Sequence, residues 1–233
     1  MQFPRKQTLR HTSIRNPWLD LPPSPPYALE ADLAQLNSFN ASALRKHQFA
    51  LRLFPEPFFG TTQTPVVVLN LNPGWSPEDE ATHSQPWFAD QSRRSLAHAL
   101  EPYPFIHLQP GGRTGGCIWW QRRTRELVDD VGFDRIAKGI ACVQYMPYHS
   151  PEFSQRVPLV QSQEYSFQLV RDAMRRGAEI VVMRSFQLWV SAIPEITTYA
   201  HLHVAVNPRS PYLSPGNLKC SYVKIVERLR RDA

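Results

Sequence analysis

The sequence predicts a three-layer α/β/α domain, in which helices cover both faces of a central, mainly parallel sheet of four strands. Four short apolar segments rich in β-branched residues have the length of buried strands: 66–71, 140–145, 180–184 and 202–206. Helical patterns lie between them, and strands that alternate with helices predict parallel pairing. With 233 residues the chain can bury one core, so we expect a single domain spanning residues 1–233.

The segments between the strands read as helices because their apolar residues recur with helical spacing. We expect helices at 92–100, 119–131, 162–176, 186–193 and 214–230. Residues 28–54 show the same spacing with a break near residues 37–40, which predicts two helices. Prolines clustered in residues 22–26 oppose both a helix and a central strand. We therefore interpret residues 1–60 as a Pro-rich and helical N-terminal extension packed on the core.

Composition and charge narrow the class of protein. Hydrophobic residues make up 42% of the chain and charged residues 20%, which suits a globular domain rather than a disordered chain. The net charge of +6 favours a polyanionic partner such as nucleic acid, although many basic proteins bind none. The longest apolar runs are far too short to span a bilayer, and no apolar stretch follows the basic N-terminus. We therefore expect a cytoplasmic protein without membrane association.

Cysteine, histidine and glycine patterns give no sign of a bound metal or cofactor. The cysteines, which are odd in number and widely spaced, are Cys117, Cys142 and Cys220. They argue against a disulfide framework and a four-cysteine metal site, and we interpret them as reduced thiols. The histidines lack metal-ligand spacing, and for His149 a solvated loop position is favoured over a place in a cleft. The Gly-rich segment 109–116 lacks the lysine of an ATP-binding loop, so we expect neither a metal nor a cofactor.

Two loops begin directly at the carboxyl ends of predicted strands, where parallel sheets bind their ligands. The first strand runs into Asn72-Pro73-Gly74, and the last runs into Asn207-Pro208 with serines close behind. These motifs resemble the uracil-DNA glycosylase superfamily, whose first motif ends in Asp-Pro or Asn-Pro-Gly and whose last motif is a Pro- and Ser-containing loop beginning with His or Asn. The Asn-Pro-Gly form is most similar to the mismatch-specific and single-strand-selective branches. The resemblance covers residues 65–233 in order and spacing, whereas an isolated Asn-Pro-Gly would indicate a simple turn.

The resemblance implies catalytic roles for two asparagines. Hydrolysis of an N-glycosidic bond needs a positioned water and a stabilised leaving base. Asn72 would orient the water through its amide oxygen, although an amide is a poor general base. Asn207 would donate a hydrogen bond to the departing base.

Residues that bind the base are expected beside the same loops. Gln144 lies where the superfamily often has a base-reading Asn, and its carboxamide can pair with a base edge or serve as a satisfied polar group at a strand end. Phe88, with Trp87 behind it, is the candidate for stacking on the base, although aromatic residues near a helix start more often belong to the core. Leu71 and Gly74 complete this set, since a glycine lets the backbone approach a ligand closely.

Contacts to the DNA backbone are expected from the last loop and from the basic segments. The candidates are Arg209, Ser210, Ser214, Arg113 and Arg122. Ser214 also precedes a proline and fits the N-cap of the final helix, a role compatible with phosphate binding.

The leading hypothesis is a monomeric DNA glycosylase that flips an altered base out of single- or double-stranded DNA and releases it, as in base excision repair. The main alternative is a non-enzymatic module of the same fold that binds a base, a nucleotide or modified nucleic acid. A third possibility is an enzyme that acts on a free nucleoside or nucleotide, whose binding would depend less on salt.

Overall fold

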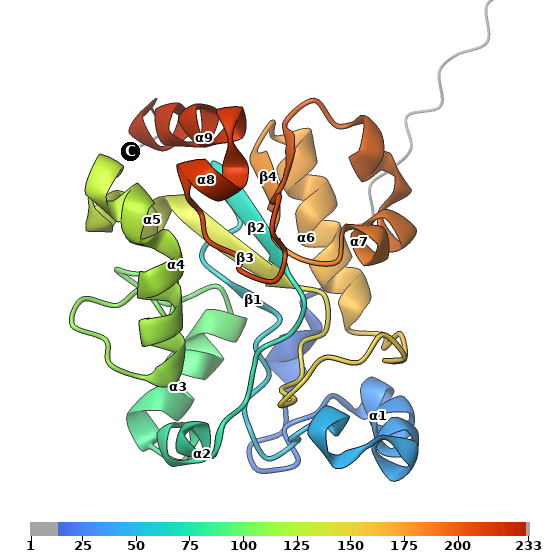
Figure 1. The fold of residues 1–233 in the computed structure, drawn as a ribbon. Helices are drawn as coiled ribbons and strands as arrows, with labels where there is room; N and C mark the ends of the chain where they lie inside the picture. The colour runs from blue at the N-terminus through green and yellow to red at the C-terminus, as the bar shows by residue number, and fades with distance from the viewer. Residues whose placement is uncertain (1–13, 232–233) are drawn as a thin grey trace, which may run out of the picture.

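The structure is a computed structural model that describes residues 14–231. It is an α/β fold with helices on both sides of one sheet (Figure 1). The strands are β1 (Phe58–Phe59), β2 (Val66–Asn70), β3 (Ile140–Gln144), β4 (Glu179–Val182) and β5 (Leu202–Val204). The α-helices are α1 (Glu30–Ser42), α2 (Pro77–His83), α3 (Pro86–Leu96), α4 (Gly115–Val131), α5 (Phe133–Gly139), α6 (Gln163–Arg175), α7 (Phe186–Ala192), α8 (Pro215–Leu218) and α9 (Cys220–Arg231). Short 3₁₀ helices are η1 (Pro17–Asp20), η2 (Arg45–His47) and η3 (Pro194–Thr198).

The sheet has the strand order β1-β3-β2-β4-β5. The four predicted strands all form, and each pairs in parallel with its neighbours among them. The predicted sheet of four strands is nevertheless incomplete, because β1 adds a fifth strand that pairs antiparallel with β3. At two residues, β1 is too short to give a periodic pattern in the sequence. The α/β class is therefore confirmed, and the sheet is mixed.

Two hydrophobic cores lie on the two faces of the sheet, and β2 contributes to both. Val67 and Leu69 point into the core covered by α6 and α7, while Val66 and Val68 point into the core covered by α4, α5 and α9. This alternation follows from the pleat, which sends successive side chains to opposite faces. Figure 1 shows the same layers, with α6 on one side of the sheet and α4 and α9 on the other.

The N-terminal region differs from the predicted pair of helices. The helix α1 continues through residues 37–40, and the following residues form only the short η2. Asn40 lies in the last turn of α1, and its side chain pairs with the loop that follows the helix. Its Nδ2 donates to the carbonyl of Phe49 at 3.0 Å, and its Oδ1 accepts from the Phe49 amide at 2.7 Å. Earlier in the chain, Trp18 and Leu21 are buried in the core, and residues 1–13 of the predicted extension lie outside the described residues.

The C-terminal segment also differs, since the predicted helix 214–230 is divided into α8 and α9. The division falls at Lys219, whose φ of 54° lies in the left-handed region and interrupts the helical path. No helix within residues 14–231 has both the length and the hydropathy needed to cross a membrane.

Candidate functional site

A cavity of about 570 Å³ lies at the carboxyl ends of β2 and β3. These strands end at Asn70 and Gln144, which are Cα partners in the parallel register. The cavity is therefore in the position where parallel sheets bind ligands. Four of the predicted site residues line it, namely Asn72, Gly74, Phe88 and Gln144.

Asn72 is held in one orientation by its amide nitrogen. Its Nδ2 donates to the carbonyl of Pro73 and to Oγ of Ser150, both at 3.0 Å. The Ser150 hydroxyl donates its own hydrogen to the carbonyl of Glu152, so it can only accept from Asn72. Among the described residues nothing donates to Oδ1 of Asn72, which leaves this oxygen available to a ligand or a water.

Two buried carboxamides lie side by side on the cavity wall. Gln144 is 3% exposed and Asn70 is 6% exposed, and both line the cavity. Neither Oε1 of Gln144 nor Oδ1 of Asn70 has a hydrogen-bond partner among the described residues. Because buried polar groups normally have partners, this pair is suited to a polar ligand edge. The sequence reasoning identified Gln144 but missed Asn70.

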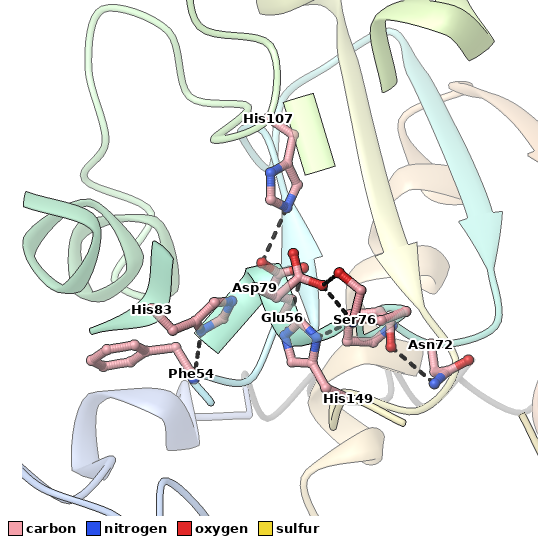
Figure 2. Close-up of polar contacts among 10 residues, drawn as sticks. Phe54, Glu56, Asn72, Ser76, Asp79, His83, His107 and His149 are labelled. Carbon is pink, nitrogen blue, oxygen red and sulfur yellow. Dashed lines mark hydrogen bonds and ion pairs between the residues drawn. The ribbon is translucent and has the colours of Figure 1, made fainter. Parts of the chain in front are cut away.

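A cluster of histidines around Glu56 forms another part of the wall (Figure 2). Glu56 precedes β1 and is buried, and its Oε1 accepts a hydrogen bond from Nε2 of His107 at 3.1 Å. Nε2 of His149 lies 3.9 Å from Oε2 of Glu56, which is too long for a hydrogen bond. Nδ1 of His149 donates to the carbonyl of Gly74 at 2.7 Å. His149 is thus a buried cavity residue rather than the solvated loop residue that the sequence favoured.

Burial and charge set the protonation states in this cluster. Burial alone would raise the pKa of Glu56, but the neighbouring histidines, His107 foremost, together outweigh it and lower the pKa to about 2. Burial alone would likewise lower the pKa of His107, but the charge of Glu56, together with the hydrogen bonds to Glu56 and Cys117, raises it to about 10. Burial lowers the pKa of His83 to about 3. At neutral pH the wall therefore holds a carboxylate–imidazolium pair beside a neutral His83.

Proximity alone would suit a metal ion here, because Glu56, His83 and His149 offer ligand atoms within 4.8 Å of one another. The hydrogen bonding does not fit a metal. Nδ1 of His83 accepts a hydrogen bond from the backbone N–H of Phe54 at 3.0 Å, so the proton of the neutral ring is on Nε2. A protonated nitrogen has no lone pair for a metal, and the cluster is better suited to hydrogen bonding and proton transfer.

The last loop does not reach this cavity. Asn207 is exposed, and its Oδ1 accepts from the backbone amides of Arg209 at 3.1 Å and Ser210 at 3.3 Å. Its side chain therefore closes a local turn instead of lining the cavity with Asn72. Two residues predicted to bind the base also lie elsewhere, since Trp87 is 49% exposed outside the cavity and Leu71 lines a second hollow.

This second hollow, of about 550 Å³, shares Arg184 with the first, so the two adjoin. It is lined by Leu71, Arg184 and Arg209, among others. Among the described residues, no acceptor forms a hydrogen bond with the half-buried guanidinium of Arg184. Burial and the charge of Arg123 lower the pKa of Arg184. A half-buried cation in this setting is suited to an anion such as a phosphate.

The other residues predicted to contact the DNA backbone fall into two groups. Ser214 is buried and caps α8, with its Oγ accepting from the amide of Asn217 at 3.3 Å. Arg113 and Arg122 are exposed and line neither hollow. Their exposure is compatible with contacts to a large polyanion but does not point to a specific one.

Comparisons of the chain with protein-family models, curated proteins and solved structures found no match.

Proposed function

We propose that this chain is a uracil-DNA glycosylase-like hydrolase that releases uracil or another altered base from DNA. The observation that carries the proposal is the cavity at the carboxyl ends of β2 and β3, which Asn72, Gln144 and Phe88 line together. These residues come from three separate segments of the chain, and the resemblance gives each of them a role at one flipped nucleotide.

The cavity has the size and chemistry to hold a base. Its volume of about 570 Å³ lies within the usual range of small-molecule sites. Gln144 presents a buried carboxamide without a partner in the described chain, and such a group can pair with the donors and acceptors of a base edge. Phe88 is 2% exposed and lines the cavity, so its ring belongs to the core and is also available for stacking.

The second hollow supports contact with the DNA backbone. Arg184 and Arg209 both line it, and Arg184 also lines the base cavity. A nucleotide whose base enters the first cavity would carry its flanking phosphates toward these guanidinium groups.

A non-catalytic base-binding module is the second candidate, and the last loop favours it. The oxygen of Asn207 is occupied by its own turn, and its side chain does not line the cavity. The proposed enzyme therefore lacks the side chain that the resemblance assigns to the leaving base.

Base release from labelled oligonucleotides tests the proposal. The panel carries uracil, hypoxanthine, xanthine or an oxidised base, each in single- and double-stranded form, and alkaline cleavage detects the abasic product. The glycosylase proposal requires release from at least one substrate. Binding without release from the whole panel supports the non-catalytic module, and binding of free nucleotides that is insensitive to salt supports an enzyme acting on small molecules.

A further inference from the structure

Glu56 and His149 present two hydrogen-bond acceptors to the same point of the cavity. Oε1 of Glu56 is occupied by His107, while Oε2 has no hydrogen-bond donor among the described residues. His149 is 4% exposed, and its Nε2 is buried without a partner. Because Nδ1 of His149 donates to the carbonyl of Gly74, Nε2 of the neutral ring is an acceptor.

One water molecule would satisfy both acceptors. Oε2 and Nε2 are 3.9 Å apart, and two acceptors cannot bond to each other. A water that donates one hydrogen to each would span this gap with two hydrogen bonds of about 2.8 Å. His83 adds a donor to the same cluster, since its Nδ1 is occupied by Phe54 and its Nε2 carries the proton. In Figure 2 the three histidine rings surround the carboxylate of Glu56.

We propose that Glu56 is the catalytic base, and that it and His149 hold the water that attacks the sugar. This inference rests on the glycosidase activity proposed above. The oxygen of the water forms a bond to C1′, and its proton passes to Oε2 of Glu56. The C1′–N bond breaks, and its electron pair leaves with the base, which takes a proton from solvent. Glu56 then returns its proton to solvent.

A carboxylate fills a role that Asn72 cannot. An amide oxygen orients a water but cannot accept its proton, whereas an ionised carboxylate, even one of low pKa, accepts that proton as the oxygen of the water bonds to C1′ and the water becomes acidic. Glu56 stays ionised because the charges of the neighbouring histidines, His107 foremost, favour its carboxylate. His107 also donates to Oε1 and so acts as a positioning residue. Asn72 lines the same cavity with its oxygen free and can accept a hydrogen bond from the water as it moves toward the sugar.

The first test uses matched variants in single-turnover assays on the best substrate of the panel. Glu56→Gln keeps the size of the side chain and an acceptor for His107, and we expect base release to fall by about 100-fold or more, with DNA affinity unchanged. His149→Asn keeps a donor for the carbonyl of Gly74 but lacks the Nε2 acceptor, and we expect a smaller loss. The control is Glu227→Gln, which changes an exposed carboxylate on α9 outside both hollows and should leave release unchanged.

The second test separates a chemical role from a structural one. Formate added to Glu56→Ala should restore part of the activity, because a small carboxylate can enter the vacated space, and restored packing alone would not restore the rate. A crystal structure of the wild-type protein should show a water within hydrogen-bond distance of Oε2 and Nε2. If Glu56→Gln does not fold, the release rate of His149→Asn and the crystal structure of the wild-type protein still decide the proposal.

The outcomes separate this inference from the proposed function. Base release by Glu56→Gln at the wild-type rate, together with loss of release in Asn72→Ala, would overturn the role of Glu56 and leave the glycosylase in place. A wild-type protein that releases no base from any substrate would overturn both. Direct contact of Oε2 with Nε2 in the crystal, with no space for a water, would overturn the water site.

Discussion

The loop after β2 and the loop after β5 begin at the same end of the sheet, and each contains an asparagine followed by proline, yet they use that asparagine differently. Asn72 anchors its nitrogen to Ser150, which is 78 residues away, and leaves its oxygen free at the cavity. Asn207 binds backbone amides two and three residues further on and stands exposed. Asn72 is fixed by a tertiary contact in addition to the carbonyl of Pro73, whereas the side chain of Asn207 is fixed by its own turn.

The difference teaches that position at a strand end is not enough to make a catalytic residue. A local Asx-type turn is available to almost any asparagine in a loop, because its partners are always nearby. The anchor of Asn72 exists only because the loop after β3 brings Ser150 to it. A side chain is available for chemistry when another segment of the chain, rather than its own backbone, fixes its orientation.

The largest expected effect comes from comparing the two asparagines directly. We expect Asn72→Ala to reduce base release by about 100-fold or more while DNA affinity is nearly unchanged, because the lost contact acts in the transition state. Asn207→Ala should change release by only a few-fold, since its side chain is used in its own turn. Single-turnover rates and binding curves measure both. Equal losses of base release in the two variants would contradict this expected difference and would indicate that the last loop contacts the substrate.

The second comparison concerns the paired carboxamides of the cavity. Gln144→Ala and Asn70→Ala should each weaken discrimination between bases by about 1–3 kcal/mol. This corresponds to a roughly 5- to 150-fold smaller ratio between the release rates on a good and a poor substrate. Their Cα atoms are register partners, so a double-mutant cycle should show coupling. Competition assays on two oligonucleotides give the ratios. Additive losses would mean that the two residues contact separate parts of the substrate.

Whether a residue of this site could be predicted from the sequence depends on where it lies in the chain. Gln144 was predicted from the resemblance, but a simpler signal, a polar residue at or just after the end of a buried strand, also applies to Asn70 at the end of β2 and to Arg184 after β4. Glu56, His83 and His107 gave no such signal, since they lie in loops or at a helix end and meet only in the folded chain. The four parallel strands were predictable because their apolar runs are long enough to show a pattern, whereas the two residues of β1 are not.

The histidine cluster in the cavity wall predicts that the stability of the protein depends on pH. Burial lowers the pKa of His83 to about 3, so between pH 6.5 and 3 the unfolded chain binds a proton that the folded chain does not. Stability should therefore fall with decreasing pH in this window by about 1.4 kcal/mol per unit for this residue. Urea unfolding at several pH values measures the slope. His83→Asn keeps an acceptor for the Phe54 amide but does not titrate in this window, so its slope should be shallower. An unchanged slope in this variant would show that His83 is not the group responsible.

The smallest expected effect distinguishes the two arginines of the second hollow. Arg184 is half-buried and lines both hollows, while Arg209 is exposed and lines only the second. If each contacts one phosphate, alanine at either position should reduce the salt slope of DNA binding by about 0.9 for double-stranded DNA. Arg184→Ala should lose more affinity at any one salt concentration, because its guanidinium is already partly desolvated before DNA arrives. Fluorescence anisotropy across a salt series measures the slope and the affinity together. A salt slope that neither variant changes would remove the last loop and its neighbouring hollow from the DNA-binding surface, and would leave the cavity of Asn72 as the part of the molecule to which a ligand must be assigned.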